Sequence, residues 1–160
     1  MSTIRSPEQA VRKRLTAYLN EEREIDNQIE RIENLEEKIT GIQSPDLSGM
    51  PKGQNVSKDR MLKMVAEKLE LEREVRAMID HHEQESAWIK RTVKRIKKPD
   101  ERACIRMRYL DMEGWGKVSK MLYGAKKDYH LRTDSYIRRT TKLHGRAIKS
   151  MACCLAEKEG

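Results

Sequence analysis

The side chains best suited to bind a partner are cations and one hydroxyl group near the end of the chain. They recur at helical spacing and share one broad face of a predicted helix: Ser135, Arg138, Arg139, Lys142, Arg146 and Lys149. Arginine can donate two hydrogen bonds to guanine O6 and N7, and lysine or serine can hold phosphate oxygens. The major groove of duplex DNA admits one such helix, so these residues predict DNA binding. An ordinary solvated basic surface is the alternative.

Further cations precede this helix. Lys117 and Lys120 lie on the outer side of a short predicted helix, where they would meet the phosphate backbone. Lys126, Lys127 and Arg132 lie in the polar stretch between the two helices. This stretch is either a basic wing or an extra helical turn.

The charge of the chain is segregated. The formal net charge is +8, which favours a polyanionic partner. Residues 21–38 carry eight acidic and three basic residues. Residues 88–98 carry six basic residues and no acid, and residues 125–149 carry eight basic residues and two acids. The positive charge therefore lies in the second half.

Other chemistry has little support in the sequence. There is no glycine-rich phosphate loop and no Ser/His/Asp set, so we expect neither an enzyme nor a cofactor. His81 and His82 are neighbours and would point about 100° apart on a helix, which argues against a metal site. Cys104, Cys153 and Cys154 are an odd set that we interpret as small buried or half-buried apolar residues. The sequence has no apolar run long enough to suggest a membrane span, and we expect a cytoplasmic protein.

The first ninety-eight residues predict two long helices. Ser6-Pro7-Glu8-Gln9 is a capping-box start for a helix that runs to about Ile39. A loop at about 40–57 precedes a second helix, from Ser57 or Lys58 to Pro99. Apolar residues follow one stripe on each helix: Val11, Leu15, Tyr18, Ile25, Ile29, Ile32, Leu35 and Ile39; then Met61, Val65, Leu69, Val75, Ile79, Ile89, Val93 and Ile96. We expect an antiparallel hairpin whose thin core dimerises or packs against another chain.

Short helices follow in residues 99–160. One starts at Pro99, Gly114 interrupts the chain, and a second runs from Trp115 to about Tyr123, with Gly124 after its end. Thr133 or Asp134 would cap the last helix, which runs to about Leu155. The predicted inward side chains are Trp115, Val118, Met121, Leu122, Ile137, Thr141, Ala147, Ile148 and Met151, whereas His130 and His144 would touch phosphate or solvent. The whole chain is thus predicted to be all-α, with a hairpin over 1–98 and a three-helix helix-turn-helix domain over 99–160.

Two segments resemble known DNA-binding proteins. Residues 108–118 (RYLDMEGWGKV) resemble the pattern Arg-Tyr-Leu/Ile-x-Gly-x-Ser/Thr-Trp-x-x-Ile/Val at the start of the fourth region of bacterial sigma factors. Residues 143–148 (LHGRAI) are similar to an ending seen in ArpU/RinA-type phage transcriptional regulators, as is the loop at 48–53. The resemblance places Ser135, Arg138, Arg139 and Lys142 on a recognition helix, and Trp115 and Val118 on its supporting helix.

That resemblance implies a phage or prophage protein that binds promoter DNA and activates late genes. The hairpin would then mediate homodimerisation or contact bacterial RNA polymerase. The connection from Gly124 to Thr133 is longer than in the family, and Gly116 and Gly145 are unusual within helices. A small terminase subunit is the competing interpretation, although its usual order places the DNA-binding module first. A scaffold whose basic end binds an acidic protein is a third.

Overall fold

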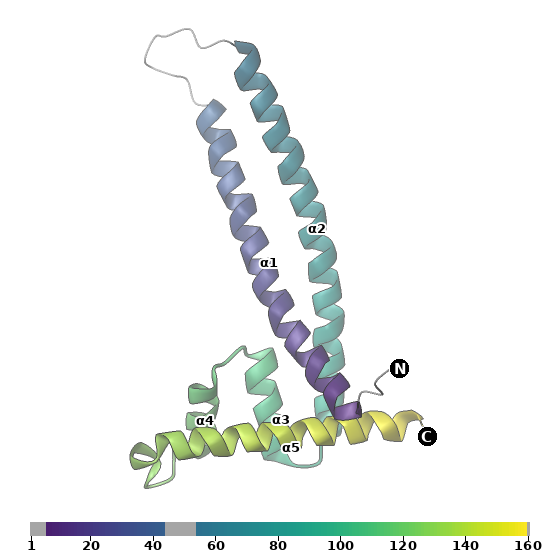
Figure 1. The fold of residues 1–160 in the computed structure, drawn as a ribbon, viewed down its shortest axis with the longest axis vertical. Helices are drawn as coiled ribbons and strands as arrows, with labels where there is room; N and C mark the ends of the chain where they lie inside the picture. Colours follow the sequence, from purple (N-terminus) through teal and green to yellow (C-terminus); the bar gives the residue numbers. More distant parts are fainter. Residues whose placement is uncertain (1–5, 44–53, 160) are drawn as a thin grey trace. The chain divides into compact units, whose positions relative to one another are not determined.

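The computed structural model describes residues 6–43 and 54–159, and these residues are almost entirely helical. Five α-helices follow one another: α1 (Pro7–Gln43), α2 (Gln54–Arg95), α3 (Pro99–Ile105), α4 (Trp115–Tyr123) and α5 (Thr133–Glu159) (Figure 1). A π-helical turn at Arg106–Leu110 follows α3, and a 3-10 turn at Tyr129–Leu131 precedes α5. No strand occurs in the described ranges, so the prediction of an all-α chain is confirmed.

The ends of the elements follow local chemistry. The predicted capping box at the start of α1 is confirmed: the Gln9 amide donates to Ser6 Oγ at 3.3 Å, and the Ser6 amide donates to Gln9 Oε1 at 3.2 Å. α3 begins at Pro99, where a missing N–H costs nothing. At the start of α5, however, Thr133 Oγ1 donates to the Tyr129 carbonyl at 3.2 Å instead of capping the helix.

The chain divides into two compact units, each described by itself. Unit 1 comprises residues 1–20 and 83–160, and unit 2 comprises residues 21–82. This division differs from the expected boundary at 98/99. The reason lies within unit 1, where the first turns of α1 and the end of α2 share one hydrophobic core with α3 and α5.

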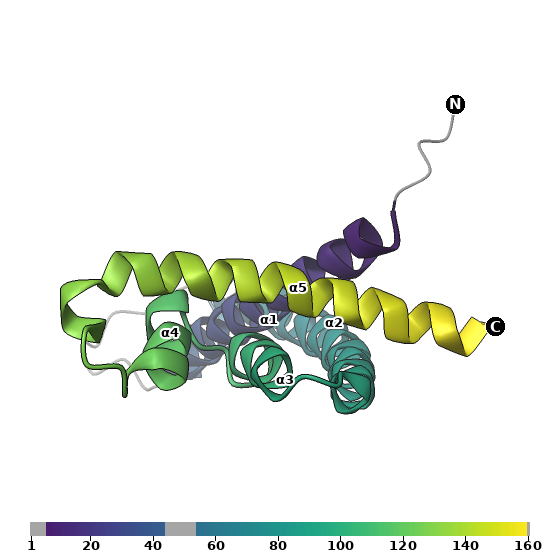
Figure 2. The ribbon, with the colours of Figure 1, turned by 90° about the horizontal axis from the view of Figure 1, so that it is seen from below.

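The main core of unit 1 takes side chains from α1, α2, α3, the π-helical turn and α5. Its members are Val11, Leu15, Tyr18, Trp88, Ile89, Val93, Ile96, Ile105, Tyr109, Ala147, Ile148, Met151 and Ala152. A second, smaller cluster joins Cys104 and Met107 to Val118 of α4 and Leu143 of α5. α5 lies beside both α3 and α4 (Figure 2). Packing of this kind fixes the direction in which each face of α5 points.

Unit 2 contains antiparallel parts of α1 and α2. Arg31 pairs with Glu67 at 2.7 Å, and Lys68 pairs with Glu36 at 3.0 Å, so residues nearer the end of α1 meet residues nearer the start of α2. The helices reach Gln43 and start again at Gln54, so residues 40–43 and 54–57 are helical and not loop. Residues 44–53 of the predicted loop lie outside the described residues.

The apolar stripe of unit 2 departs from the predicted one. Leu69 is 54% exposed, and Ile29 and Ile79 are 38% and 36% exposed, although all three were predicted to point inward. Leu71, which the stripe omitted, is buried next to Val75. An α-helix has 3.6 residues per turn, so a near-heptad stripe drifts around a long helix and the inward face passes to other residues.

Candidate nucleic-acid interface

The last helix presents a basic face because its opposite face is packed. Tyr136, Thr140, Leu143, Ala147 and Ile148 are buried at helical spacing. The side chains on the other side are exposed: Ser135, Arg138, Lys142, Arg146 and Lys149. Sequence periodicity predicted this exposed face. The set of inward residues was partly wrong, however, because Thr141 is exposed and Thr140 is fully buried in its place.

Arg139 is exposed but not unattached. Its guanidinium carbon lies 5.1 Å from the centre of the Tyr123 ring, at the end of α4. A cation over an aromatic face is attracted by the ring quadrupole. Arg139 is therefore held toward α4, whereas Arg138 forms no ion pair with the described residues and lines a groove at the start of α5.

α4 packs across this region through Val118 and Ser119, which are fully buried, and through the half-buried Trp115 and Leu122. Met121 was predicted to point inward but is 63% exposed. On a nine-residue helix with one packed side, Met121 falls on the outer side with Lys117 and Lys120.

The two lysines of α4 differ in their surroundings. Lys117 Nζ pairs with Glu113 one turn earlier at 2.8 Å, an exposed ion pair that a phosphate could displace. Lys120 is exposed, and no acid among residues 6–43 and 54–159 lies within 4.0 Å of it. Lys120 is thus the more available phosphate ligand.

The connection from α4 to α5 contains an extra helical turn, one of the two predicted alternatives. Tyr129 is buried, and its ring centre lies 5.5 Å from that of Tyr136 on α5. The Tyr136 hydroxyl donates to Asp128 Oδ1 at 2.5 Å, which lowers the pKa of Asp128 and raises that of Tyr136. This aromatic packing fixes the connection to the first turn of α5. Lys126 and Lys127 are exposed on it.

A groove lies at the start of α5. It has a volume of about 360 Å³ and is lined by His130, Leu131, Arg132, Thr133, Asp134, Ser135 and Arg138. The structure thereby brings three predicted residues together, Arg132, Ser135 and Arg138, although Arg132 also lies 3.8 Å from Asp128. Leu131 is 88% exposed at the rim, and sequence reasoning missed it because a leucine in a basic stretch gives no signal of exposure.

His144 is the clearest correction. It was predicted to touch phosphate or solvent, but it is only 5% exposed and its Nε2 lies 2.6 Å from the Tyr109 hydroxyl. The Trp115 ring meets it edge-on, with ring centres 4.9 Å apart. Burial lowers the pKa of His144 to about 4 and raises that of Tyr109 to about 12. A neutral His144 therefore accepts a hydrogen bond from the Tyr109 hydroxyl, which joins α5 to the turn after α3. Its spacing from Thr140 and Ile148 could have shown that it points inward.

The turn before α4 has an unusual backbone. Met112 has a φ of 56°, a left-handed conformation that disfavours side chains with a Cβ. The sigma-type pattern has glycine at this position. Arg108 supports the turn, since its Nη1 donates to the Glu113 carbonyl at 3.0 Å and its guanidinium carbon lies 4.6 Å from the Trp115 ring centre. Gly124, by contrast, has a right-handed φ of −59°, so it is not the left-handed cap that its type suggested.

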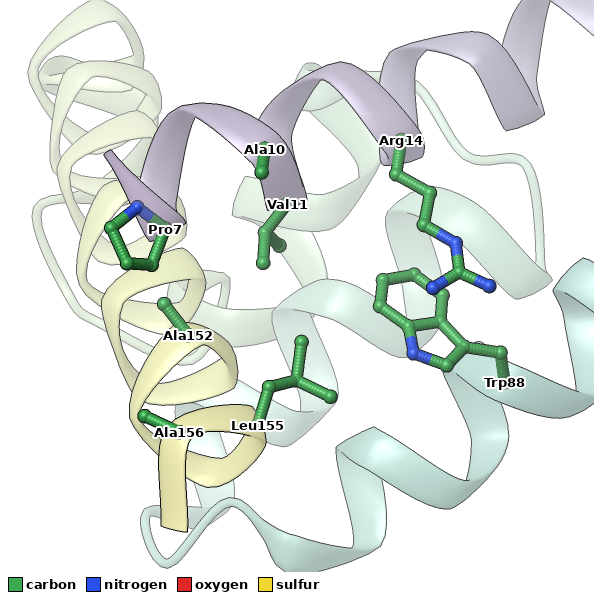
Figure 3. Close-up of a pocket in the computed structure, with 8 residues that line it drawn as sticks. All are labelled: Pro7, Ala10, Val11, Arg14, Trp88, Ala152, Leu155 and Ala156. Atoms are coloured by element: carbon green, nitrogen blue, oxygen red, sulfur yellow. The ribbon is translucent and has the colours of Figure 1, made fainter. Parts of the chain in front are cut away.

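A pocket in unit 1 lies apart from these cations. It has a volume of about 220 Å³ and is lined by Pro7, Ala10, Val11, Arg14, Trp88, Ala152, Leu155 and Ala156 (Figure 3). The Arg14 guanidinium covers Trp88, with its carbon 3.7 Å from the ring centre, and Arg14 also donates to both Glu85 carboxylate oxygens. Arg14, the charged side chain of this pocket, is thus already held by Trp88 and Glu85.

Cysteines and possible metal ligands add no further site. Cys104 and Cys154 are buried and Cys153 is exposed, contrary to its interpretation as a buried or half-buried residue. Burial raises the pKa of Cys104 to about 11, which keeps its thiol protonated. In the part of the chain that the structure describes, no three His, Cys, Asp or Glu side chains gather as a metal site, and no helix there is long and apolar enough to cross a membrane.

No family model, curated protein or solved structure matches this chain.

Proposed function

We propose that the chain is a sequence-specific regulator of phage or prophage transcription that binds duplex DNA through α5. The observation that carries the proposal is the exposed basic face at the start of α5, held outward by buried residues on the opposite side. One α-helix fits the major groove of B-DNA, and the residues near its start reach the base edges.

The different surroundings of the two neighbouring arginines support different proposed roles. Arg138 lies at the groove beside Ser135, with a guanidinium free to approach a base edge. Arg139 is drawn toward Tyr123 and is better placed to bind a phosphate beside the groove. Lys120, Lys126 and Lys127 would add phosphate contacts, which position the protein without reading sequence.

The hairpin is proposed to join two copies of the chain. Among its described residues, unit 2 exposes four large apolar side chains: Ile29, Leu62, Leu69 and Ile79. Leu62 and Leu69 lie two turns apart on one face of α2, and contiguous exposed apolar patches mark association surfaces. Contact with RNA polymerase is the competing role, and light scattering of the free protein separates the two.

Titration of binding with salt tests the DNA proposal, with a candidate promoter duplex and a scrambled duplex of equal length. Arg138→Ala should weaken binding to the promoter by about 1–3 kcal/mol and leave the scrambled duplex nearly unchanged. Lys120→Ala should weaken both equally and reduce the salt slope by about 0.9. Equal small losses from both variants on both duplexes would refute the recognition helix. A large closed ring in light scattering would favour a terminase subunit over a regulator.

A further inference from the structure

A second basic surface lies at the end of α2, outside the interface described above. It consists of the six cations between Trp88 and Pro99, here called the α2 basic patch: Lys90, Arg91, Lys94, Arg95, Lys97 and Lys98. All six are exposed, and no acidic residue interrupts residues 88–98. The proposed recognition of DNA by α5 uses none of them.

The opposite side of this helix end is firmly buried. Ile89, Thr92, Val93 and Ile96 are each at most 3% exposed and belong to, or lie beside, the main core of unit 1. Since residues three and four apart share a face, Lys90 with Lys94 and Arg91 with Arg95 form two rows that point away from that core. The four helical cations of the patch therefore lie on a fixed helix surface, and Lys97 and Lys98 follow them in the turn between α2 and α3.

Two acids near the patch, Glu85 and Glu101, are engaged elsewhere, while the exposed Asp100 lines a groove with Lys98. Glu85 is occupied by Arg14, and the buried Glu101 accepts a hydrogen bond from the Ser150 hydroxyl at 2.6 Å. Within residues 6–43 and 54–159, no ion pair joins any of the six cations to a carboxylate. This is the opposite of unit 2, where Arg31 and Lys68 both pair with glutamates of the facing helix.

The composition of the patch favours phosphate over a folded protein. Interfaces with proteins are rich in aromatic and apolar side chains at their centre and depleted in lysine. No large hydrophobic side chain is exposed between residues 83 and 111. Duplex DNA, in contrast, carries one negative charge per about 1.7 Å of its axis. Cations spaced about 6 Å apart along an α-helix can therefore each contact a phosphate.

The patch is attached rigidly to α5. The Cys154 thiol donates to the Arg95 carbonyl at 3.5 Å, so the last third of α5 packs against the end of α2 (Figure 2). A groove of about 390 Å³ lined by Lys98, Pro99, Asp100, Glu101, Leu143 and Arg146 joins the α2–α3 turn to the basic face of α5. Ser135 and Cys154 are about 28 Å apart along the helix, so most of the length of α5 separates its basic start from the patch.

We propose that the α2 basic patch is a second, sequence-independent binding surface for the sugar–phosphate backbone of duplex DNA. It contacts phosphates outside the segment that α5 reads, either farther along the same duplex or on a second one. The proposal does not require α5 to recognise a sequence.

The decisive variant is Lys90→Gln/Arg91→Gln/Lys94→Gln. Its matched control, Arg23→Gln/Lys63→Gln/Arg76→Gln, removes the same charge from exposed positions of unit 2. Both are tested on random duplexes of about one and about four helical turns, at several salt concentrations. The patch variant should reduce the salt slope on the long duplex by up to about 2.7, and the control should leave it unchanged. Equal helix content and thermal midpoints of the two variants exclude a folding effect.

The outcomes separate the two proposals. An unchanged slope in the patch variant, with DNA binding intact, overturns the patch and leaves the α5 proposal standing. Loss of promoter preference in Arg138→Ala, with the patch effect retained, supports both. Competition by polyglutamate as strong as by duplex of equal charge would overturn the assignment to DNA. Sedimentation then distinguishes the source of phosphate: two short duplexes per chain indicate a second duplex, and one indicates the same duplex.

Discussion

Unit 1 and unit 2 each contain part of α1 and of α2 but are stabilised differently, since unit 1 also contains α3, α4 and α5. Unit 2, residues 21–82, carries 15 acidic and 10 basic residues, and its described part buries four large apolar side chains, Ile25, Leu35, Leu71 and Val75. The rest of the chain carries 11 acidic and 24 basic residues and encloses two hydrophobic clusters. The formal net charge is therefore −5 for unit 2 and +13 for the rest of the chain. The difference teaches that the unit with the larger core holds an unpaired basic surface, whereas the thin one carries cations that pair with glutamates of the facing helix.

Core substitutions should give the largest contrast. Ile148→Ala removes a fully buried side chain from unit 1 and should cost about 2–5 kcal/mol of unfolding free energy. Leu62→Ala in unit 2, where the side chain is 62% exposed, should stay within about 0.5 kcal/mol. Urea unfolding at two protein concentrations measures both. A large, concentration-dependent loss in Leu62→Ala would show that a second copy covers unit 2.

Acid should weaken unit 1 through His144. Its pKa is about 4 in the folded protein and about 6.5 when unfolded, so the unfolded state binds the proton more tightly. The contribution of neutral His144 is present above pH 6.5 and is lost as the pH falls toward 4, by up to about 3 kcal/mol. Thermal melts from pH 7.5 to 4 should show this loss, and His144→Phe should flatten it. An equally steep pH dependence in that variant would assign the effect to other groups.

Substitutions at two backbone positions in unit 1 should increase the free energy of unfolding. A Cβ at Gly145 meets nothing within 4 Å, so the glycine serves no close helix crossing among the described residues, and Gly145→Ala should add about 1 kcal/mol. Met112→Gly should relieve the left-handed strain by a similar or smaller amount. Differential scanning calorimetry measures both gains, with exposed Gly41→Ala as the reference in unit 2. A loss in Gly145→Ala would mean that unseen packing uses this position.

The ion pairs of unit 2 should give the smallest single effects. Arg31 and Glu67 are both about half exposed, so Arg31→Ala should cost at most about 0.5 kcal/mol in dilute buffer and nothing at 1 M salt. A double-mutant cycle with Glu67→Ala isolates the pair from the loss of each side chain. A coupling energy well above this value would mean that unit 2 is more rigid than its exposure indicates.

Much of the fold could be predicted from the sequence, since it depends on local rules. The capping box at Ser6, the proline start of α3 and the exposed spacing of Arg138, Lys142 and Lys149 all follow from neighbours along one helix. Helical periodicity likewise predicted the two long helices. These features need no knowledge of what packs against them.

Tertiary structure decided what periodicity leaves open. The burial of His144 depends on Tyr109, thirty-five residues earlier, and the orientation of Arg139 depends on Tyr123. Whether Met121 or Leu122 faces inward on a short helix depends on which side α5 covers. The compact units also cross the expected boundary, because Leu15, Ile105 and Ile148 meet in one core. The burial of a side chain depends on residues far away in the sequence. The sequence by itself therefore determined which residues share a helix face, and only the tertiary packing decided which of these faces contact one another.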